Sequence, residues 1–369
     1  MLGWLVASDA IVRLDGSRVT ADAIDQRIEF VMQKASVHGL GVAVVQDGQV
    51  RYQKAFGYAD VATKRPLHPE TVMYAASFTK AMFAYVVMQL AEEGKIDLDR
   101  SIEAYLKKPL PEYPKYADLA GDDRWKKLTA RLLLSHQSGF ANFRFVEPDG
   151  KLRFHFEPGG RYAYSGEGIN LLQFVLDDMG LDVGQLLQTR LVSRFGLQKT
   201  SARWRDDFLE DLAYGHLEDG KSVGHNKRES VRAAGSMDTT LADFTKFALA
   251  VSKREGLSRK SWQAMFSPQV RIRTEAQFPT LRETVTTKYD EIQLSYGIGW
   301  GVFQTPYGRA VFKEGHDDGW ENHVVCFDKR RTCLVLMSNS SNGDKTFRNL
   351  LEFIIGDKYT PWEWENYLE

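Results

Sequence analysis

The sequence predicts an α+β fold in which one antiparallel β-sheet, flanked by terminal helices, carries an inserted all-helical domain. β-prone segments lie near both ends of the 369-residue chain, and its middle consists of helical and loop patterns. An isolated hairpin is only marginally stable, so strands from the two ends are expected to pair. We therefore expect a sheet domain from residues 1–75 and 291–369, a mainly helical domain from 76–290, and an active site at their junction.

Composition and charge limit the possible functions. The chain has 48 Lys and Arg against 49 Asp and Glu, a net charge of −1, which offers no field for nucleic acid or an anionic membrane. No run of about 18 apolar residues occurs, so no membrane span is expected. The short apolar start at 1–8 is either a trimmed signal, which implies a periplasmic or secreted protein, or an N-terminal element of a cytoplasmic one.

The first elements are a helix and a hairpin. Residues 20–36 carry apolar side chains at helical spacing, and Thr20 is placed to cap the first turn. Two β-prone runs then flank Asp47-Gly48, the strongest short signal for a hairpin. Residues 55–69 are expected to form an irregular link to the next helix.

A helix that is apolar on nearly every side is predicted from Ser77 to Gly94. Such a helix is buried, and glycine ends it because glycine adopts a positive φ without a Cβ penalty. Its first turn places Ser77 and Lys80 on one face. A serine becomes a nucleophile when a base removes its proton, and lysine does so when burial or a nearby cation lowers its pKa. Alone, the S-x-x-K spacing is also a common chance match.

The remaining segments alternate between helices, loops and strands. Helical patterns occur at 96–102, 128–136, 169–179, 183–195, 240–253 and 343–356. Loops are expected at 107–118, 147–160 and 270–290, the last as a surface excursion. Strands are expected at 296–303, 310–313, 324–327 and 332–338.

The only cysteines, Cys326 and Cys333, lie in a predicted hairpin that turns at Lys329-Arg330. They would face each other directly across the two strands. Direct cross-strand pairing strains a disulfide, so free thiols are predicted. Their spacing does not match a metal site.

Two further segments offer groups that a Ser–Lys nucleophile needs. Tyr164 lies between glycine-rich turns, where it would present its phenol to a cleft and a nearby lysine would lower its pKa; the alternative is a tyrosine that only packs. Residues 313–323 interrupt the strand pattern, and their glycines allow a backbone N–H to face a developing oxyanion. The alternative there is a turn with solvated acids.

Metal and cofactor chemistry receive little support. His316, Asp317, Asp318 and His323 are potential ligands close in sequence, so metal-dependent hydrolysis is kept as an alternative. No His-x-x-x-His pair lies on a predicted helix, and we expect neither metal nor cofactor. Gly-x-Ser-x-Gly, Gly-x-Gly-x-x-Gly and P-loop motifs are also absent from the sequence, which disfavours an α/β-hydrolase and a nucleotide-binding protein.

The order and spacing of several motifs between about 41 and 338 resemble the serine β-lactamase/penicillin-binding-protein-like superfamily. The class C β-lactamase branch, with family VIII carboxylesterases, D-aminopeptidases and DD-peptidases, is the most similar. The motifs are Gly41-Val-Ala-Val-Val, Ser77-Phe-Thr-Lys80, Leu133-Leu-Ser-His-Gln-Ser-Gly139, Tyr164-Ser, Ala233-Ala-Gly-Ser-Met, Tyr296-Gly-Ile-Gly-Trp and Gly315-His316. The resemblance implies a β-lactamase/transpeptidase-like fold, in agreement with the pattern of elements.

The resemblance also implies roles for individual residues. Ser77 matches the acylated nucleophile, Lys80 the group that activates it, and Tyr164 the tyrosine general base of the second motif. His316 matches the third-motif position that holds Lys, His or Trp. The oxyanion hole would be formed by the backbone N–H groups of Ser77 and Gly319.

Trp320 follows Gly319 and is expected at the substrate. The second motif of β-lactamases reads Tyr-x-Asn, whereas Gly166 stands here and the amide that touches the substrate is missing. The third motif ends in glycine, whereas Asp318 stands here after Asp317, and both acids would repel a substrate carboxylate.

These features together predict a serine hydrolase that forms an acyl-enzyme on Ser77 and acts on a small-molecule ester, amide or β-lactam. The departures disfavour an efficient β-lactamase or carboxypeptidase and favour an esterase, or a peptidase or amidase whose substrate lacks that carboxylate. A carboxylesterase is the expected activity, with a β-lactamase or a D-amino-acid peptidase or amidase as the alternative. A catalytically silent relative that binds a peptide or cell-wall fragment is the alternative of another class. The oligomeric state is left open.

Overall fold

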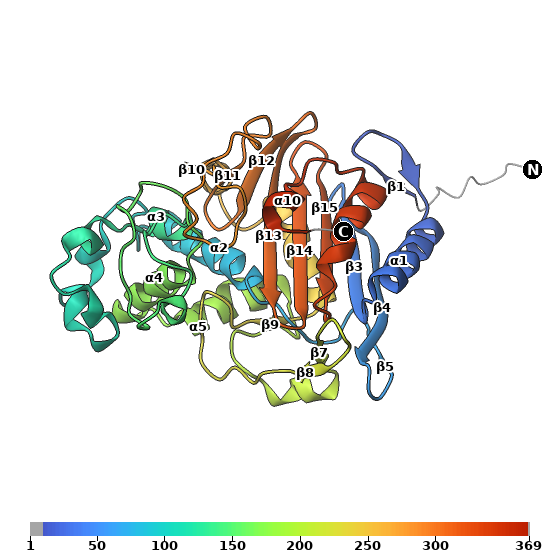
Figure 1. The fold of residues 1–369 in the computed structure, drawn as a ribbon, viewed down its shortest axis with the longest axis horizontal. Helices are drawn as coiled ribbons and strands as arrows, with labels where there is room; N and C mark the ends of the chain where they lie inside the picture. The colour runs from blue at the N-terminus through green and yellow to red at the C-terminus, as the bar shows by residue number, and fades with distance from the viewer. Residues whose placement is uncertain (1–9, 368–369) are drawn as a thin grey trace, which may run out of the picture.

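A nine-stranded antiparallel sheet forms the centre of the computed structural model, which describes residues 10–367 (Figure 1). The strand order is β10-β11-β12-β13-β14-β15-β3-β4-β5. Strands from the two ends of the chain therefore meet where β15 pairs with β3, and the predicted α+β fold is confirmed. The apolar start at 1–8, interpreted as a signal remnant or N-terminal element, lies outside the described residues.

The strands of the main sheet are β3 (Gly39–Gln46), β4 (Gln49–Asp60), β5 (Arg65–Pro66), β10 (Val270–Arg271), β11 (Ser295–Tyr296), β12 (Gly301–Thr305), β13 (Gly308–Asp317), β14 (Trp320–Phe327) and β15 (Thr332–Ser338). Three small pairs are β1 (Ile11–Val12) with β2 (Arg18–Val19), β6 (Met73–Tyr74) with β9 (Asp238–Thr239), and β7 (Gly215–His216) with β8 (Ser222–Gly224).

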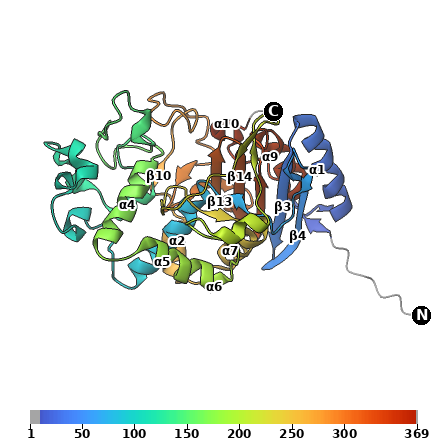
Figure 2. The same ribbon diagram turned by 90° about the horizontal axis from the view of Figure 1, so that it is seen from below.

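The α-helices are α1 (Ala21–Ala35), α2 (Phe78–Glu92), α3 (Ala130–Leu134), α4 (Gly166–Asp178), α5 (Val183–Leu187), α6 (Ser193–Phe195), α7 (Leu241–Lys253), α8 (Arg259–Met265), α9 (Asp344–Leu350) and α10 (Trp362–Glu365). Helices α3 and α4 lie toward one end of the molecule and α1 at the other (Figure 1), and α4 and α1 are also far apart in the second view (Figure 2). Within residues 10–367, no helix combines the length and apolar character needed to cross a membrane.

Alternation along the central strands divides the core into two layers. Leu334 and Leu336 of β15 join a cluster with residues of α1 and α9. Val335 and Met337, the alternate residues, join the cluster that contains α2 and α7. Successive side chains of a strand point to opposite faces, so one strand anchors the terminal helices on one face and the helices of the middle region on the other.

Helix α2 is the buried helix that the sequence predicts. Its residues from Phe78 to Leu90 are all buried, and Phe78 stacks on Phe244 of α7 with ring centroids 4.0 Å apart. The chain leaves the helix at Gly94, where φ is +69°. Burial on every side fixes the position of the first turn, which carries Ser77 and Lys80.

Three local expectations differ from the structure. The expected irregular link at 55–69 contains the end of β4, which extends to Asp60, and all of β5. The predicted helix at 96–102 does not form; a short 3-10 turn, η1 (Ile102–Tyr105), follows instead. Residues 313–323 do not interrupt the strands. They continue β13 and β14, which turn only at Asp318-Gly319. Polar side chains in these strands had hidden the alternating pattern.

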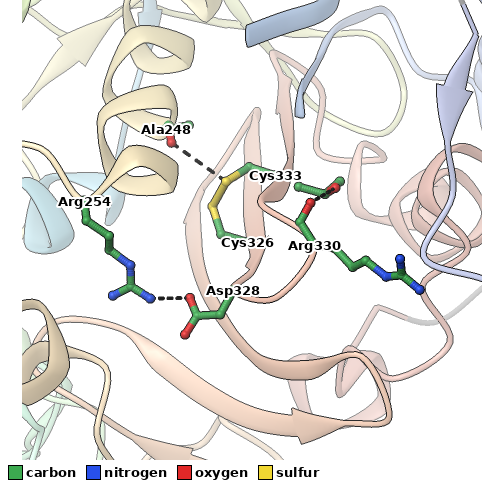
Figure 3. The surroundings of a disulfide bond; sticks show 7 residues. Ala248, Arg254, Cys326, Asp328, Arg330 and Cys333 are labelled. Atoms are coloured by element: carbon green, nitrogen blue, oxygen red, sulfur yellow. Dashed lines mark hydrogen bonds and ion pairs between the residues drawn. A yellow bond between two sulfur atoms is a disulfide. The ribbon is translucent and has the colours of Figure 1, made fainter. Parts of the chain in front are cut away.

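The prediction of free cysteines is wrong. Cys326 and Cys333 lie directly opposite each other in β14 and β15 and form a disulfide (Figure 3). Their Cα atoms are 4.1 Å apart, the close approach typical of a pair that shares no backbone hydrogen bonds. Both side chains point toward α7, where Cys333 Sγ lies 3.8 Å from the Ala248 carbonyl oxygen.

We predict that Leu334→Ala lowers the free energy of unfolding by about 2–5 kcal/mol, because it opens a cavity between the central strand and the terminal helices. Leu334 is fully buried. Urea denaturation measures the change. Val50→Ala, at an exposed position of β4, is the control and should stay within about 0.5 kcal/mol of the wild type. Equal effects of the two substitutions would contradict the assignment of the core.

Candidate active site

The first turn of α2 brings a hydroxyl and an amine into contact. Lys80 Nζ lies 2.8 Å from Ser77 Oγ and donates a hydrogen bond to the Ala234 carbonyl oxygen at 2.6 Å. The Lys80 side chain is buried. Burial, and then the nearby charge of Lys313, holds the pKa of Lys80 well below its usual value, while Glu314 acts in the opposite direction. A lysine in this state can accept the serine proton.

The backbone before Ser77 is held in an unusual conformation. Ala76 has φ +46°, in the left-handed region that alanine rarely adopts. Thr79 Oγ1 donates to the Ala76 carbonyl at 2.7 Å, and the Ala75 N–H donates to the Met237 carbonyl at 3.0 Å. Strained backbone of this kind concentrates at functional sites, and here it directs the nucleophile turn.

Tyr164 lies between two buried lysines. Its hydroxyl accepts a hydrogen bond from Lys313 Nζ at 3.2 Å, and Lys80 Nζ is 4.9 Å from the centre of its ring. Burial, followed by the charge of Glu314, raises the pKa of Tyr164 well above its usual value, and a hydrogen bond with Ser77 opposes this. The expectation that a nearby lysine lowers this pKa is therefore wrong, and the resting phenol is protonated.

His136, from the Leu-Ser-His-Gln-Ser-Gly segment, supports Tyr164 from behind. Its ring lies 4.2 Å from the Tyr164 ring, centroid to centroid. Its Nδ1 accepts the backbone N–H of Ser165 at 3.1 Å. Burial and then the charges of Lys80 and Lys313 lower the pKa of His136 well below its usual value, so it is a neutral acceptor that fixes the backbone next to Tyr164.

Sequence reasoning missed Lys313. This residue is fully buried on β13, and besides Tyr164 its Nζ contacts Glu314 Oε1 at 2.7 Å and the Glu314 carbonyl at 3.2 Å. Glu314 Oε1 also accepts a hydrogen bond from Gln277 at 2.8 Å. Lys313-Glu-Gly315 fits the Lys-x-Gly form of the third motif without the offset found at His316. The Lys-x-Gly pattern was therefore visible in the sequence, within residues 313–323, which were expected to interrupt the strands.

Strand β13 has a free edge beside Ser77. Its neighbour β12 pairs with it only as far as Phe312, so no strand among residues 10–367 pairs with 313–317 on that side. Gly315 lies against the nucleophile turn: a Cβ atom there would be 2.7 Å from the Ala75 carbonyl oxygen and 3.3 Å from the Ser77 nitrogen. Only glycine permits this approach.

The register of β13 identifies a backbone donor at this edge. Asp317 and Trp320 close a two-residue turn, so they and Gly315, two residues back, share backbone hydrogen bonds with β14. By alternation the N–H of His316 points away from β14, toward the edge beside Ser77. The N–H groups of Ser77 and His316 therefore border the Ser77 hydroxyl, and an oxyanion hole requires two such donors.

The side chain of His316 does not occupy the place expected for it. It is mostly exposed, and its Nδ1 lies 2.5 Å from Glu321 Oε1. The hydrogen bond to Glu321 raises the pKa of His316 to about 9, so the imidazole is a cation at neutral pH. The buried lysine beside Tyr164 is Lys313.

The expectation that the Gly319 N–H forms the oxyanion hole is wrong. That N–H donates to Ser341 Oγ at 2.8 Å, and a Cβ at Gly319 would be 2.8 Å from the backbone of Gly215 and of His216. Because the third motif was expected to begin at His316, the backbone donor was expected three residues later, at Gly319.

Trp320 is buried rather than exposed to a substrate. Its ring contacts Tyr74 edge-on, with centroids 6.3 Å apart, and His225, with centroids 5.2 Å apart. It therefore supports the strand that leads into the Ser77 turn.

The residues weighed as metal ligands do not form a cluster. His323 is fully buried and contacts Tyr367 and Glu365, whereas the side chain of His316 is exposed. Among residues 10–367, no group of three or more His, Cys, Asp or Glu side chains is arranged to hold a metal ion.

With this geometry in place, comparison with known proteins identifies the family. The Beta-lactamase family model matches residues 24–356, and the chain belongs to this family of serine hydrolases. A penicillin-binding protein of Bacillus subtilis (strain 168) is 23% identical over 334 residues, 81% of this chain and 67% of that protein. D-aminopeptidase of Brucella anthropi is 23% identical over 354 residues, 92% of this chain and 64% of that enzyme. The chain thus spans about two thirds of the length of these relatives.

Solved structures agree on the fold. The octameric penicillin-binding protein homologue from Pyrococcus abyssi superimposes with a TM-score of 0.74 at 19% identity, covering 94% of this chain and 80% of that one. A D-alanine carboxypeptidase from Burkholderia cenocepacia gives a TM-score of 0.71 at 18% identity, with 89% and 97% covered.

We predict that Gly315→Ala slows acylation of Ser77 by about 100-fold, because the added methyl pushes β13 and its backbone donor away from the nucleophile. The measurement is the second-order rate of labelling by a fluorophosphonate probe. A far-UV circular dichroism spectrum like that of the wild type checks the fold. Labelling at the wild-type rate would show that the β13 edge does not form the site.

Proposed function

We propose that this protein is a carboxylesterase-type serine hydrolase that forms an acyl-enzyme on Ser77. The observation that carries the proposal is the 2.8 Å contact between Ser77 Oγ and the buried, pKa-lowered amine of Lys80. A buried lysine has no structural need to contact a serine hydroxyl, whereas nucleophilic catalysis requires such a pair.

In acylation, neutral Lys80 takes the Ser77 proton while Oγ bonds to the ester carbonyl carbon. The resulting oxyanion accepts hydrogen bonds from the backbone N–H groups of Ser77 and His316. The protonated phenol of Tyr164 gives its proton to the leaving alkoxide as the C–O bond breaks. The alcohol departs, Lys80 is protonated, and the Tyr164 phenolate is held by the Lys313 cation.

Deacylation restores every group. The Tyr164 phenolate takes a proton from a water molecule, whose oxygen attacks the acyl carbon. The tetrahedral intermediate collapses, and Ser77 Oγ leaves with the proton held by Lys80. The carboxylic acid is released, Tyr164 and Ser77 are protonated again, and Lys80 is neutral. Tyr164 thus acts as an acid in the first step and as a base in the second.

Two observations favour an ester over a β-lactam or a peptide. Gly166 has no side chain and so does not supply the amide group of the Tyr-x-Asn motif, and a Cβ there would be 2.4 Å from the Phe143 ring. Asp317, half-exposed at the end of β13, places an acid near the site and pairs with Arg228 at 3.9 Å. A carboxylate-bearing substrate would meet that acid. A β-lactamase or D-amino-acid peptidase remains the alternative within the family, and a silent peptide-binding relative the alternative of another class.

Intact-mass spectrometry tests the proposal with a p-nitrophenyl ester, a cephalosporin, a D-alanyl peptide and a fluorophosphonate. We predict an adduct and turnover that Ser77→Ala abolishes, with the ester the most reactive substrate. Ser222→Ala, at an exposed serine, is the matched control and should react like the wild type. No adduct from any compound would support the silent relative, and a more reactive cephalosporin or peptide would select the other branch.

We predict that Glu314→Gln shifts the acidic limb of the kcat/KM profile to lower pH. The rate requires neutral Lys80, so it falls as the pH drops through the Lys80 pKa. Glu314 raises that pKa against burial and Lys313; removing the carboxylate lowers it further. Glu112→Gln, at an exposed acid, should leave the limb in place. A limb that moves to higher pH in Glu314→Gln would contradict the role of Lys80 as base.

A further inference from the structure

An aromatic ring takes the space beside the second motif that a side chain at position 166 would need. A Cβ at Gly166 would be 2.4 Å from both Cε1 and Cζ of Phe143. Asn142 Oδ1 accepts the Gly166 N–H at 3.0 Å, and the Asn142 carbonyl accepts the Glu167 N–H at 2.8 Å. The segment that carries Phe143 is therefore fixed against the start of α4.

The aromatic surface continues to Phe145, which is 75% exposed. Its ring stacks on Phe143 with centroids 5.1 Å apart and planes 15° apart. The intervening 3-10 turn, η5 (Arg144–Val146), is held by Glu167: Oε1 accepts from the backbone N–H of Arg144 at 3.0 Å and from its Nε at 3.1 Å, and Oε2 accepts from its Nη2 at 3.1 Å. These hydrogen bonds hold the exposed Phe145 ring in place. Exposing an apolar ring to water is unfavourable, and the fold does not require it.

A second exposed ring lies on Tyr164. Phe278 is 47% exposed, and its ring meets the Tyr164 ring edge-on with centroids 5.8 Å apart. The preceding residue, Gln277, donates its backbone N–H to the Trp364 carbonyl at 2.8 Å and its side-chain N–H to Glu314 Oε1 at 2.8 Å. Phe278 is therefore also held in place by an anchored neighbour.

Two of these rings contact residues of the candidate site: Phe278 lies on Tyr164, and Phe143 lies at Gly166. Gly166 lies two residues after Tyr164, whose ring is 4.9 Å from Lys80 Nζ. It also lies one helical turn before Asn170, which accepts the N–H of Ala234 at 3.1 Å. The carbonyl of Ala234 is the second acceptor for Lys80. The segment from Tyr164 to Asn170 thus contacts the surroundings of Lys80 at both ends. Tyr164 lies beside the Lys80 amine, and Asn170 binds Ala234, whose carbonyl accepts from Lys80.

We propose that Phe143, Phe145 and Phe278 form an apolar acyl subsite, and that the substrates are esters of carboxylic acids with an extended apolar acyl chain. This inference rests on the proposed esterase function. The acyl group stays on Ser77 through both chemical steps, so an apolar contact with it holds the carbonyl in place for each of them. In this protein, apolar contact with the phenylalanine rings would take the place of the hydrogen bond that the asparagine of the Tyr-x-Asn motif makes to a substrate amide.

The test uses p-nitrophenyl acetate and p-nitrophenyl octanoate with the wild type, Phe145→Ala and Phe278→Ala. Each methylene that leaves water contributes about 0.8 kcal/mol, so the wild type should favour octanoate over acetate in kcat/KM by at least about tenfold. Each alanine variant should lower this ratio by about fivefold or more. Phe30→Ala is the matched control, since Phe30 is 57% exposed on α1, at the opposite end of the molecule from α4 (Figures 1 and 2). It should keep the wild-type ratio.

The outcomes separate the subsite from the underlying function. Absence of fluorophosphonate labelling of wild-type Ser77 would overturn the esterase function itself. Labelling together with a wild-type ratio near 1, or with a ratio that neither phenylalanine substitution changes, would overturn the apolar subsite alone. A chain-length preference that appears only in a series of acetate esters with longer alcohols would place the apolar group on the leaving side and would also overturn the proposal.

Discussion

The site depends on two lysines buried next to each other, with one carboxylate paired to the second of them. Lys80 and Lys313 both lie against the ring of Tyr164, and Glu314 contacts only the second of them. Removing two ammonium groups from water is costly, and one carboxylate balances one charge. Burial beside Lys313 lowers the pKa of Lys80, which favours its neutral form and makes it the candidate base for Ser77.

This arrangement requires α2 and β13 to approach closely. Helix α2 supplies Ser77 and Lys80 from a buried first turn, while β13 supplies Lys313 and the edge that β12 leaves unpaired. Gly315 permits the contact because it has no side chain. The contact between the start of α2 and the unpaired part of β13 therefore sets three things together. It packs the helix on the sheet, it positions Ser77, and it brings the backbone N–H groups of β13 close to Ser77.

Elements with a regular apolar period were predictable from the sequence, whereas the strands that carry the site were not. The helix after Ser77, the hairpin at Asp47-Gly48 and the strands of both chain ends follow from periodicity and turn residues. The strand predicted at 310–313 was ended too early, because Lys313 and Glu314 are polar although both are buried. Sequence patterns predict structure least well at buried polar positions. For this reason the third motif was expected at His316 instead of Lys313, and the oxyanion donor at Gly319 instead of His316. The disulfide differs from the prediction for another reason. The sequence correctly indicated that Cys326 and Cys333 face each other, but the strain of a direct cross-strand bond predicted free thiols.

The central claim is that Ser77 is acylated at the β13 edge. Its most direct test is a crystal structure of the enzyme after reaction with a small alkyl fluorophosphonate. The account predicts phosphorus bonded to Ser77 Oγ and a phosphonyl oxygen about 3 Å from the backbone nitrogens of Ser77 and His316. A phosphonyl oxygen turned toward Gly319 or into solvent, or phosphorus bonded to another residue, would contradict it.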